Sequence, residues 1–117
     1  MSDCLFCKII EKKIDAKIVY EDERALAFRD INPVASTHVL IVPKKHIATI
    51  DDVTEDDEPV MGHLYRVASE VAEQEGLRAR GYRTVMNCKE EAGQSVFHVH
   101  LHVVGGQRFG WPPFPNG

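Results

Sequence analysis

Three histidines alternate with apolar residues near the end of the chain, and this stretch constrains the fold more than any other. It runs from residue 97 to residue 104, directly before the glycine pair 105–106. Successive side chains of a β-strand point to opposite faces, so a strand here puts His98, His100 and His102 on one face and apolar side chains on the other. Residues two apart on a strand lie roughly 6 to 7 Å apart, close enough for the imidazoles to act on one phosphate or one metal ion. The stretch therefore predicts a strand with one chemical face and one core face.

The composition is that of one soluble domain, and we expect residues 1–117 to form a single folded unit. The 117 residues are 44% hydrophobic and 27% charged, which is ordinary for a chain with a real core. The formal charge is −4 and the 14 basic residues are scattered. Duplex nucleic acid is therefore a poor candidate for the main partner, because its binding depends on clustered basic charge. A single nucleotide remains open as a ligand.

Neither a membrane segment nor a disulfide framework is expected. The sequence has no apolar run near the roughly 20 residues that span a bilayer, and its first residues lack the features of a signal peptide. We therefore expect a cytoplasmic protein without a membrane partner. Three cysteines in a reducing compartment do not indicate disulfides, whereas Cys4-Leu-Phe-Cys7 has the spacing of a metal-ligand pair.

The order of elements predicts an α+β fold. Apolar periodicity indicates a short helix over residues 4–12 behind Asp3 as N-cap, and a long helix that begins at about Asp56 and reaches Glu75 before Gly76. Strand patterns lie at residues 18–20, 25–28, 38–42, 82–88 and 97–104. We expect a five-stranded antiparallel sheet, with residues 38–42 as a central strand and the long helix covering one face. The tail, about residues 107–117, is rich in proline and should be irregular.

The histidine pattern suits nucleophilic chemistry on a phosphate. A neutral imidazole attacks through one nitrogen while the other, protonated, donates to an acceptor that fixes the tautomer. His100 lies in the middle of the three and is the candidate nucleophile, with His102 as a donor beside it. Residues 93–95, Gly-Gln-Ser, could add backbone N–H groups and a hydroxyl as a small anion cradle. The alternatives are a metal held by the whole triplet, or packed histidines without a chemical role.

These residues resemble the signature of the histidine triad (HIT) superfamily, whose fold has the architecture predicted above. The similarity extends over almost the whole chain. The matching blocks are Phe6, Lys8-Ile9-Ile10, Ala27 to Pro33, Thr37-His38, Pro43 to His46, Gly81-Tyr82-Arg83, Asn87, Gly93 to Val96 and the triad itself. Ser95, the glycine pair and Trp111-Pro112-Pro113 are similar to the nucleoside phosphoramidase branch, the histidine triad nucleotide-binding proteins, more than to the dinucleoside polyphosphate hydrolase branch.

The resemblance implies a hydrolase that needs no cofactor for catalysis. His100 would attack the α-phosphorus of a purine nucleoside 5′-phosphoramidate, expel the amine and form a nucleotidyl-histidine, which water converts to the nucleoside monophosphate. Related acyl-adenylates are further candidate substrates. In the same mechanism His102 contacts the phosphate and Ser95 assists the departing amine. His38 and His98 would support the network, and the nucleotide-binding residues would include Asn87 and, from the cradle, Gly93 and Gln94.

The resemblance also implies a nucleoside pocket and a homodimer. Asp30 would bind the ribose hydroxyls, although on residue type alone it reads as a turn aspartate. The apolar wall around the base would consist of Phe6, Ile9, Phe28, Ile31 and Leu40, which are equally good candidates for the core. The dimer would form through the long helix and an adjacent strand, with Trp111 near the active site of the partner subunit.

Some members of the superfamily hold a zinc ion, and the matching ligands here are Cys4, Cys7, His46 and His98. Cys₂His₂ is a sensible tetrahedral zinc set, and the ion would be structural. The competing interpretation is two partly buried thiols near a surface histidine. His98 is thus a candidate both for the zinc site and for the catalytic network, and one nitrogen atom cannot serve in both.

The sequence departs from the pattern of this branch at two places, and three other functions remain open. Asp15 replaces a proline common in this branch, and the chain continues beyond Trp111-Pro112-Pro113 to Phe114-Pro115-Asn116-Gly117, which leaves the choice of leaving group open. The rival functions are dinucleoside polyphosphate hydrolysis, a non-enzymatic nucleotide-binding interaction protein, and metal storage or sensing.

Overall fold

Five short strands pair into one antiparallel sheet, as the sequence predicts. The computed structural model describes residues 3–114, and the sheet order is β1-β2-β3-β5-β4. The strands are β1 (Ile18–Glu21), β2 (Ala25–Arg29), β3 (Thr37–Pro43), β4 (Tyr82–Val85) and β5 (Leu101–Gly105). The helices are α1 (Leu5–Ile10) and α2 (Glu58–Gln74), with 3₁₀ turns at Ile50–Asp52, Glu55–Asp57 and Glu90–Ala92. The α+β prediction is confirmed, and β3 is the central strand.

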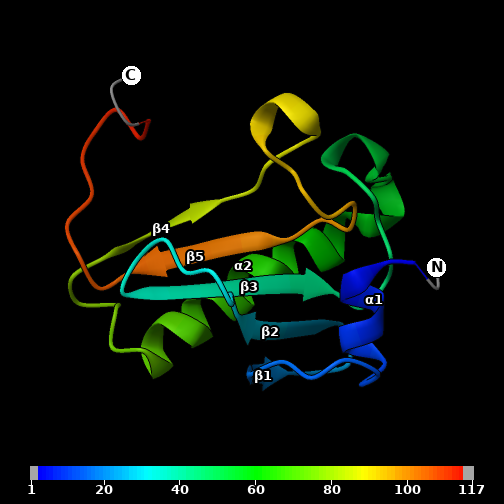
Figure 1. The fold of residues 1–117 in the computed structure, drawn as a ribbon, viewed down its shortest axis with the longest axis horizontal. Helices are drawn as coiled ribbons and strands as arrows, with labels where there is room; N and C mark the ends of the chain where they lie inside the picture. The colour runs from blue at the N-terminus through cyan, green and yellow to red at the C-terminus, as the bar shows by residue number, and fades with distance from the viewer. Residues whose placement is uncertain (1–2, 115–117) are drawn as a thin grey trace.

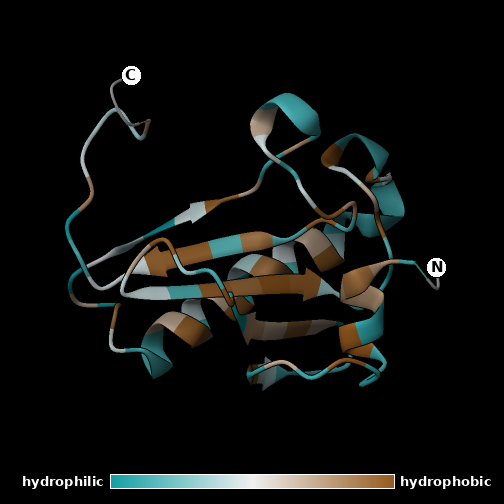
Figure 2. Cartoon of the chain, in the orientation of Figure 1, coloured by the Kyte–Doolittle hydropathy of each residue, from teal (hydrophilic) through white to brown (hydrophobic). Residues whose placement is uncertain are grey.

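The sheet buries an apolar cluster on each face. On one face α2 covers Ala25, Ala27, Val39, Ile41, Leu101 and Val103 with Leu64, Val67, Ala68 and Val71. On the other, α1 covers Leu26, Phe28, Leu40 and Val42 with Phe6 and Ile9. Figure 1 shows α2 behind the sheet and α1 near the end of β3, and Figure 2 shows the hydrophobic residues concentrated in β2, β3 and β5. Alternation along each strand thus separates a face under α2 from a face under α1.

The first helix is capped by a cysteine rather than by the predicted Asp3. Cys4 has extended backbone angles and its Sγ accepts a hydrogen bond from the backbone N–H of Cys7, at 3.4 Å. A side-chain acceptor at this position satisfies one of the free N–H groups of the first turn. The cap therefore also fixes the two sulfur atoms near each other.

The histidine strand is shorter than predicted, and only His102 of the triad lies within it. β5 pairs with β3 up to the Ile41–Leu101 pair, and β4 ends at Val85 opposite His102. The next donor position on β3 is Pro43, which has no N–H, and the N–H of Val99 instead bonds the carbonyl of Ile47 at 2.8 Å. His98, Val99 and His100 are all buried although they lie outside the strand.

The long helix begins at Glu58, two residues after the predicted start at Asp56, because a 3₁₀ turn over Glu55–Asp57 precedes it. Thr54 and Asp57 form a reciprocal capping box around Glu55–Asp57, and α2 follows from Glu58 with Pro59 in its first turn. Residues 106–114 run as irregular chain away from the sheet (Figure 1). Residues 115–117 of the predicted tail lie outside the described residues. Within residues 3–114 we find no helix with the length and apolar character to cross a bilayer.

Candidate active site

His100 is held in one tautomer by the carbonyl group of His98. Its Nδ1 lies 2.8 Å from that carbonyl oxygen, which only accepts, so Nδ1 carries the hydrogen and Nε2 carries a lone pair. The ring of Phe6 packs edge-on against the His100 ring, with 5.0 Å between centroids. Burial lowers the pKa of His100 below its usual value, which keeps the ring neutral near pH 7. The side chain thus has the protonation state of a nucleophile.

A second chain of hydrogen bonds fixes the tautomer of His102. The backbone N–H of Val34 donates to Nδ1 of His38 at 3.1 Å, so the hydrogen of His38 is on Nε2. That Nε2 lies 2.9 Å from Nδ1 of His102 and donates to it. Nε2 of His102 therefore carries a hydrogen, and it is the one buried side-chain nitrogen or oxygen within residues 3–114 that lacks a partner. Buried donors are rarely left unpaired, so this N–H is prepared for an acceptor from a ligand.

Burial keeps both rings of that chain neutral. Burial, with smaller contributions from His100 and His38, lowers the pKa of His102 to about 4. Burial also lowers the pKa of His38, although the Asp30 carboxylate acts in the opposite direction. Asp30 lies 3.5 Å from His38 and its other oxygen accepts the N–H of Asn32 at 2.8 Å.

Asp30, His38 and His102 also lie close enough to surround a cation, but the histidine tautomers do not fit one. A metal at Nε2 of His38 needs the lone pair of that nitrogen. Nδ1 already uses its lone pair to accept the N–H of Val34, and a neutral imidazole has only one. The N–H of His102 Nε2 therefore suits an acceptor from a ligand, and the carboxylate of Asp30 suits a hydroxyl donor, better than either suits a metal.

A second cluster, of Cys4, Cys7, His46 and His98, has the dimensions of a zinc site. His98 Nδ1 lies 3.4 Å from Cys4 Sγ and 3.6 Å from Cys7 Sγ, and His46 Nδ1 lies 3.4 Å from Cys7 Sγ. The two Nδ1 atoms are 3.2 Å apart. Tetrahedral zinc with ordinary bond lengths puts N and S ligands about 3.6 Å apart and two N ligands about 3.3 Å apart. The cluster is therefore able to hold a metal such as zinc.

The structure gives His98 two separate roles on different atoms. Nε2 donates to the carbonyl of Pro43 at 2.8 Å, so the lone pair is on Nδ1, which faces the two cysteines and His46. Burial, and then the nearby His46 and His100, lower the pKa of His98 to about 4. The link to His100 uses the main-chain carbonyl instead of the ring. The expected competition between metal binding and the catalytic network does not arise.

The predicted anion cradle at residues 93–95 is only partly available. Gly93 has a φ of +92°, a conformation that favours glycine. The buried amide of Gln94 is fully used, because it accepts from the N–H of Lys89 and donates to the carbonyls of Ala48 and Val96. Gln94 therefore shapes the loop. Ser95 is exposed, and with His46 and Cys4 it lines a cavity of about 460 Å³.

The remaining predicted positions divide between core and surface. Four members of the apolar wall are buried in the cluster under α1, namely Phe6, Ile9, Phe28 and Leu40. Ile31 is 89% exposed and Trp111 is 83% exposed, so for Ile31 the core alternative is wrong. Asn87 is half-buried.

Besides the carbonyl of His98, which fixes the tautomer of His100, two further main-chain groups define the site, and residue types carry no signal for them. The N–H of Val34 fixes the tautomer of His38, and the carbonyl of Pro43 fixes that of His98. Only the three-dimensional arrangement brings these groups to the rings.

Comparison with known proteins agrees with the fold. The family model for the HIT domain matches residues 11–109. The chain belongs to the HIT family. It is 44% identical over 108 residues to the purine nucleoside phosphoramidase of Escherichia coli strain K12, a match that covers 92% of this chain and 91% of that protein. It is 48% identical over 111 residues to an uncharacterized HIT-like protein of Synechocystis, covering 95% and 96% of the two chains.

Solved HIT structures have the same architecture. The crystal structure of a HIT family hydrolase from Legionella pneumophila superposes with a TM-score of 0.93 at 51% identity, and the match covers 96% of this chain and 100% of that one. A HIT family hydrolase from Clostridium thermocellum superposes with a TM-score of 0.92 at 44% identity over 94% and 96% of the two chains. The HIT fold extends over nearly all of the chain.

Proposed function

We propose that this HIT protein hydrolyses purine nucleoside 5′-phosphoramidates, and related acyl-adenylates, to the nucleoside monophosphate. One pair of atoms carries the proposal: the lone pair on Nε2 of His100 beside the unpartnered N–H on Nε2 of His102. The two rings lie 5.1 Å apart between centroids. A nucleophile next to a donor is the pair that attack on a phosphoryl group requires. The relative named purine nucleoside phosphoramidase adds support for the substrate class.

In the first step, Nε2 of His100 forms a bond to phosphorus and the phosphorus–nitrogen bond of the substrate breaks. The departing nitrogen keeps the electron pair, takes up a proton and leaves as the amine. The N–H of His102 donates to a phosphoryl oxygen, where negative charge grows. The family resemblance assigns Ser95 to the leaving-group side and Asn87 to a further phosphate contact.

In the second step, water attacks phosphorus and the bond to His100 breaks. Water gives its oxygen to the nucleoside monophosphate and releases a proton, and His100 returns as a neutral ring. The positive charge that the ring carries in the nucleotidyl intermediate is stabilised by the carbonyl of His98, which accepts the Nδ1 hydrogen throughout. This carbonyl does in the site what a carboxylate does in many histidine-dependent enzymes.

The nucleoside would extend from the histidines toward Asp30 and Ile31. The carboxylate of Asp30 offers two acceptor oxygens to the ribose hydroxyls. Ile31 is exposed, whereas Phe28 and Leu40 lie under α1. An exposed apolar side chain next to a buried apolar cluster can cover a flat purine ring.

A fluorogenic adenosine phosphoramidate tests this function. We expect turnover by the wild-type protein and a loss of more than about 10³-fold in His100→Ala, with His63→Gln as a control histidine on α2. Diadenosine tetraphosphate should be cleaved more slowly than the phosphoramidate. Equal turnover by wild type and His100→Ala would refute the mechanism, and adenosine monophosphate binding without turnover would favour a nucleotide-binding interaction protein.

Two further properties belong to this proposal. A structural zinc ion would be held by Cys4, Cys7, His46 and His98, and it would tie α1 to the segments after β3 and before β5. A homodimer would pair the free edge of β4 and the adjacent surface of α2 with a second copy. The exposed Trp111, on a segment that runs away from its own sheet (Figure 1), would then reach the partner's site.

A further inference from the structure

A second hollow lies at the end of the sheet where β4 begins and β5 ends, and none of the histidines lines it. It has a volume of about 540 Å³ and is lined by residues from the end of α2, the start of β4 and the segment after β5. Thr37 is in its lining, and Thr37 shares a face of β3 with Val39 and Ile41, which pack under α2. Arg83 is paired with Val104, which lies opposite His38, so Arg83 is on the other face and the hollow extends around the end of the sheet. We call this hollow the arginine groove.

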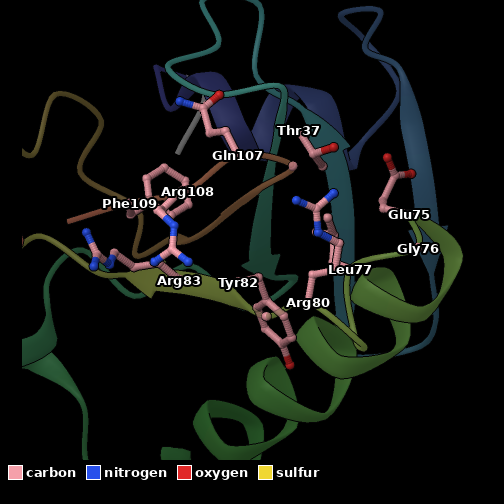
Figure 3. Close-up of a pocket in the computed structure, with 12 residues that line it drawn as sticks. Thr37, Glu75, Gly76, Leu77, Arg80, Tyr82, Arg83, Gln107, Arg108 and Phe109 are labelled. Carbon is pink, nitrogen blue, oxygen red and sulfur yellow. The ribbon is translucent and has the colours of Figure 1, made fainter. Parts of the chain in front are cut away.

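Three arginines line the arginine groove. Figure 3 shows Arg83 and Arg108 on one side and Arg80 on the other, with Thr37 and Gln107 at one end. The sole acidic residue in the lining is Glu75, and both of its carboxylate oxygens accept from the guanidinium of Arg29, at 3.1 and 2.8 Å. The negative charge of Glu75 is therefore neutralised by Arg29, which is not part of the groove lining. The groove keeps three positive charges in a chain whose formal charge is −4.

The donors of these arginines are mostly free. Arg83 uses one N–H to bond the carbonyl of Gly110 at 2.8 Å, and its guanidinium lies 5.1 Å from the ring centroid of Phe109. These contacts hold the side chain in place and leave other N–H groups available. Arg80 and Arg108 make no side-chain hydrogen bond or ion pair with any other residue between 3 and 114. Three guanidinium groups around one hollow repel one another, and a bound anion would remove that cost.

The shape of the groove favours a ligand with several phosphate oxygens. Planar guanidinium groups bind phosphate through two parallel hydrogen bonds, and arginines on two sides can hold both ends of a diphosphate. The hydroxyl of Thr37 adds a neutral donor, and the volume exceeds what one phosphate needs. We propose that the arginine groove is a second ligand site, distinct from the histidine site, that binds the diphosphate group of a small anion through Arg80, Arg83 and Arg108.

Calorimetric titration with inorganic pyrophosphate at fixed ionic strength tests the site. The histidine site also accepts phosphate, so the titration is made with and without saturating adenosine monophosphate. We expect a pyrophosphate site that adenosine monophosphate does not displace. Arg80→Gln/Arg108→Gln should weaken this site at least tenfold and leave phosphoramidate turnover unchanged. Lys13→Gln/Arg66→Gln removes the same charge elsewhere and should leave binding intact.

Three results would overturn the proposal. The first is pyrophosphate binding that adenosine monophosphate abolishes completely, which assigns it to the histidine site. The second is equal weakening by the two double variants, which indicates a nonspecific charge effect. The third is a change from dimer to monomer in Arg80→Gln/Arg108→Gln by sedimentation, which makes the groove a contact between two copies. None of these readouts depends on turnover, so failure of the proposed hydrolase function would leave the titration interpretable.

Discussion

His38 donates the hydrogen on its Nε2 to Nδ1 of His102 across 2.9 Å. The two residues come from neighbouring strands, β3 and β5, whose register puts His38 opposite Val104 and His102 opposite Leu40. This bond leaves the N–H of His102 Nε2 directed away from the protein's own acceptors. In the proposed mechanism His38 would therefore be a positioning residue, because it would act on a phosphate only through His102.

Replacing His38 by Phe should release the tautomer of His102. We expect the hydrogen of His102 to move in part to Nδ1 and kcat for the phosphoramidate to fall about 10²-fold, the lower end of the range that one positioned proton donor contributes. Nitrogen-15 NMR of the histidine rings measures the tautomer directly, and the wild-type spectrum should show His102 protonated at Nε2. Wild-type protein with the hydrogen on Nδ1 of His102 would contradict this assignment.

Lowering the pH should destabilise the fold before the carboxylates titrate. The pKa values of His98 and His102 are both lowered from 6.5 to about 4 in the folded protein. Between these values the unfolded chain binds more protons, so the stabilisation is complete above about pH 6.5 and is lost as the pH falls toward 4. One pKa unit corresponds to 1.36 kcal/mol, and between pH 7 and pH 4.5 we expect a loss on the order of 2 kcal/mol for each of these two rings in chelator-treated protein.

Urea unfolding at pH 7 and pH 4.5 measures this loss. His102→Gln removes one of the two titrating rings and should lose less stability over the same interval. Carboxylates such as Glu21, whose pKa is lowered by hydrogen bonds from Lys12 and Lys44, act in the same direction but below this window. An unchanged urea midpoint between pH 7 and pH 4.5 would contradict the assigned protonation states.

The sequence predicts the sheet, both helices and the separation of faces because these depend on periodicity and on local breakers. It overestimates β5, because the length of a strand depends on its neighbours. Pro43 and the early end of β4 remove the partners of residues 97–100, and neither effect is local to that segment. The sequence does not predict the cysteine cap of α1 either, because aspartate is a commoner N-cap residue than cysteine.

The glycine pair shows that the reason a residue is required can depend on the fold and not on the local sequence. The residue types show that positions 105 and 106 are unusual. They do not show that each glycine is required for a different structural reason. A Cβ at Gly105 would lie 2.8 Å from a methyl carbon of Leu77, whereas Gly106 has a φ of +86° and a Cβ there would lie 2.8 Å from Ser36. The arginine groove has no signal in the sequence, because Arg80, Arg83 and Arg108 come from two distant segments.

Zinc removal should destabilise the protein, and the two cysteines should account for the effect. Elemental analysis is expected to find one zinc per chain, and chelation should lower the thermal midpoint because α1 loses its tie to His46 and His98. Burial and the hydrogen bond to Cys4 raise the pKa of the Cys7 thiol to about 11, so rebinding zinc should release protons. Cys7→Ser should abolish the zinc content. Cys88→Ser, outside the cluster, is the matched control, and zinc well below one per chain in wild type would refute the site.

Trp111 is expected to act on the active site of the partner subunit. The base of its segment is fixed by the hydrogen bond from Arg83 to Gly110, while the indole is 83% exposed on its own protomer. Sedimentation should show a dimer, and Trp111→Ala should lower turnover without dissociating it. These results alone do not separate action within one subunit from action across the interface.

Mixed dimers make that separation. A His100→Ala protomer has an intact Trp111, and a Trp111→Ala protomer has an intact His100. If the indole acts across the interface, the heterodimer contains one complete site, and refolding the two variants together should give more turnover than the average of the two parents. If the indole acts on its own subunit, the mixture should equal that average, because no site then combines His100 with Trp111. If turnover of the mixture equals the average of the two parents, action on the partner subunit no longer explains why residues 106–114 run away from the sheet. An exposed aromatic side chain contributes little to the stability of its own fold.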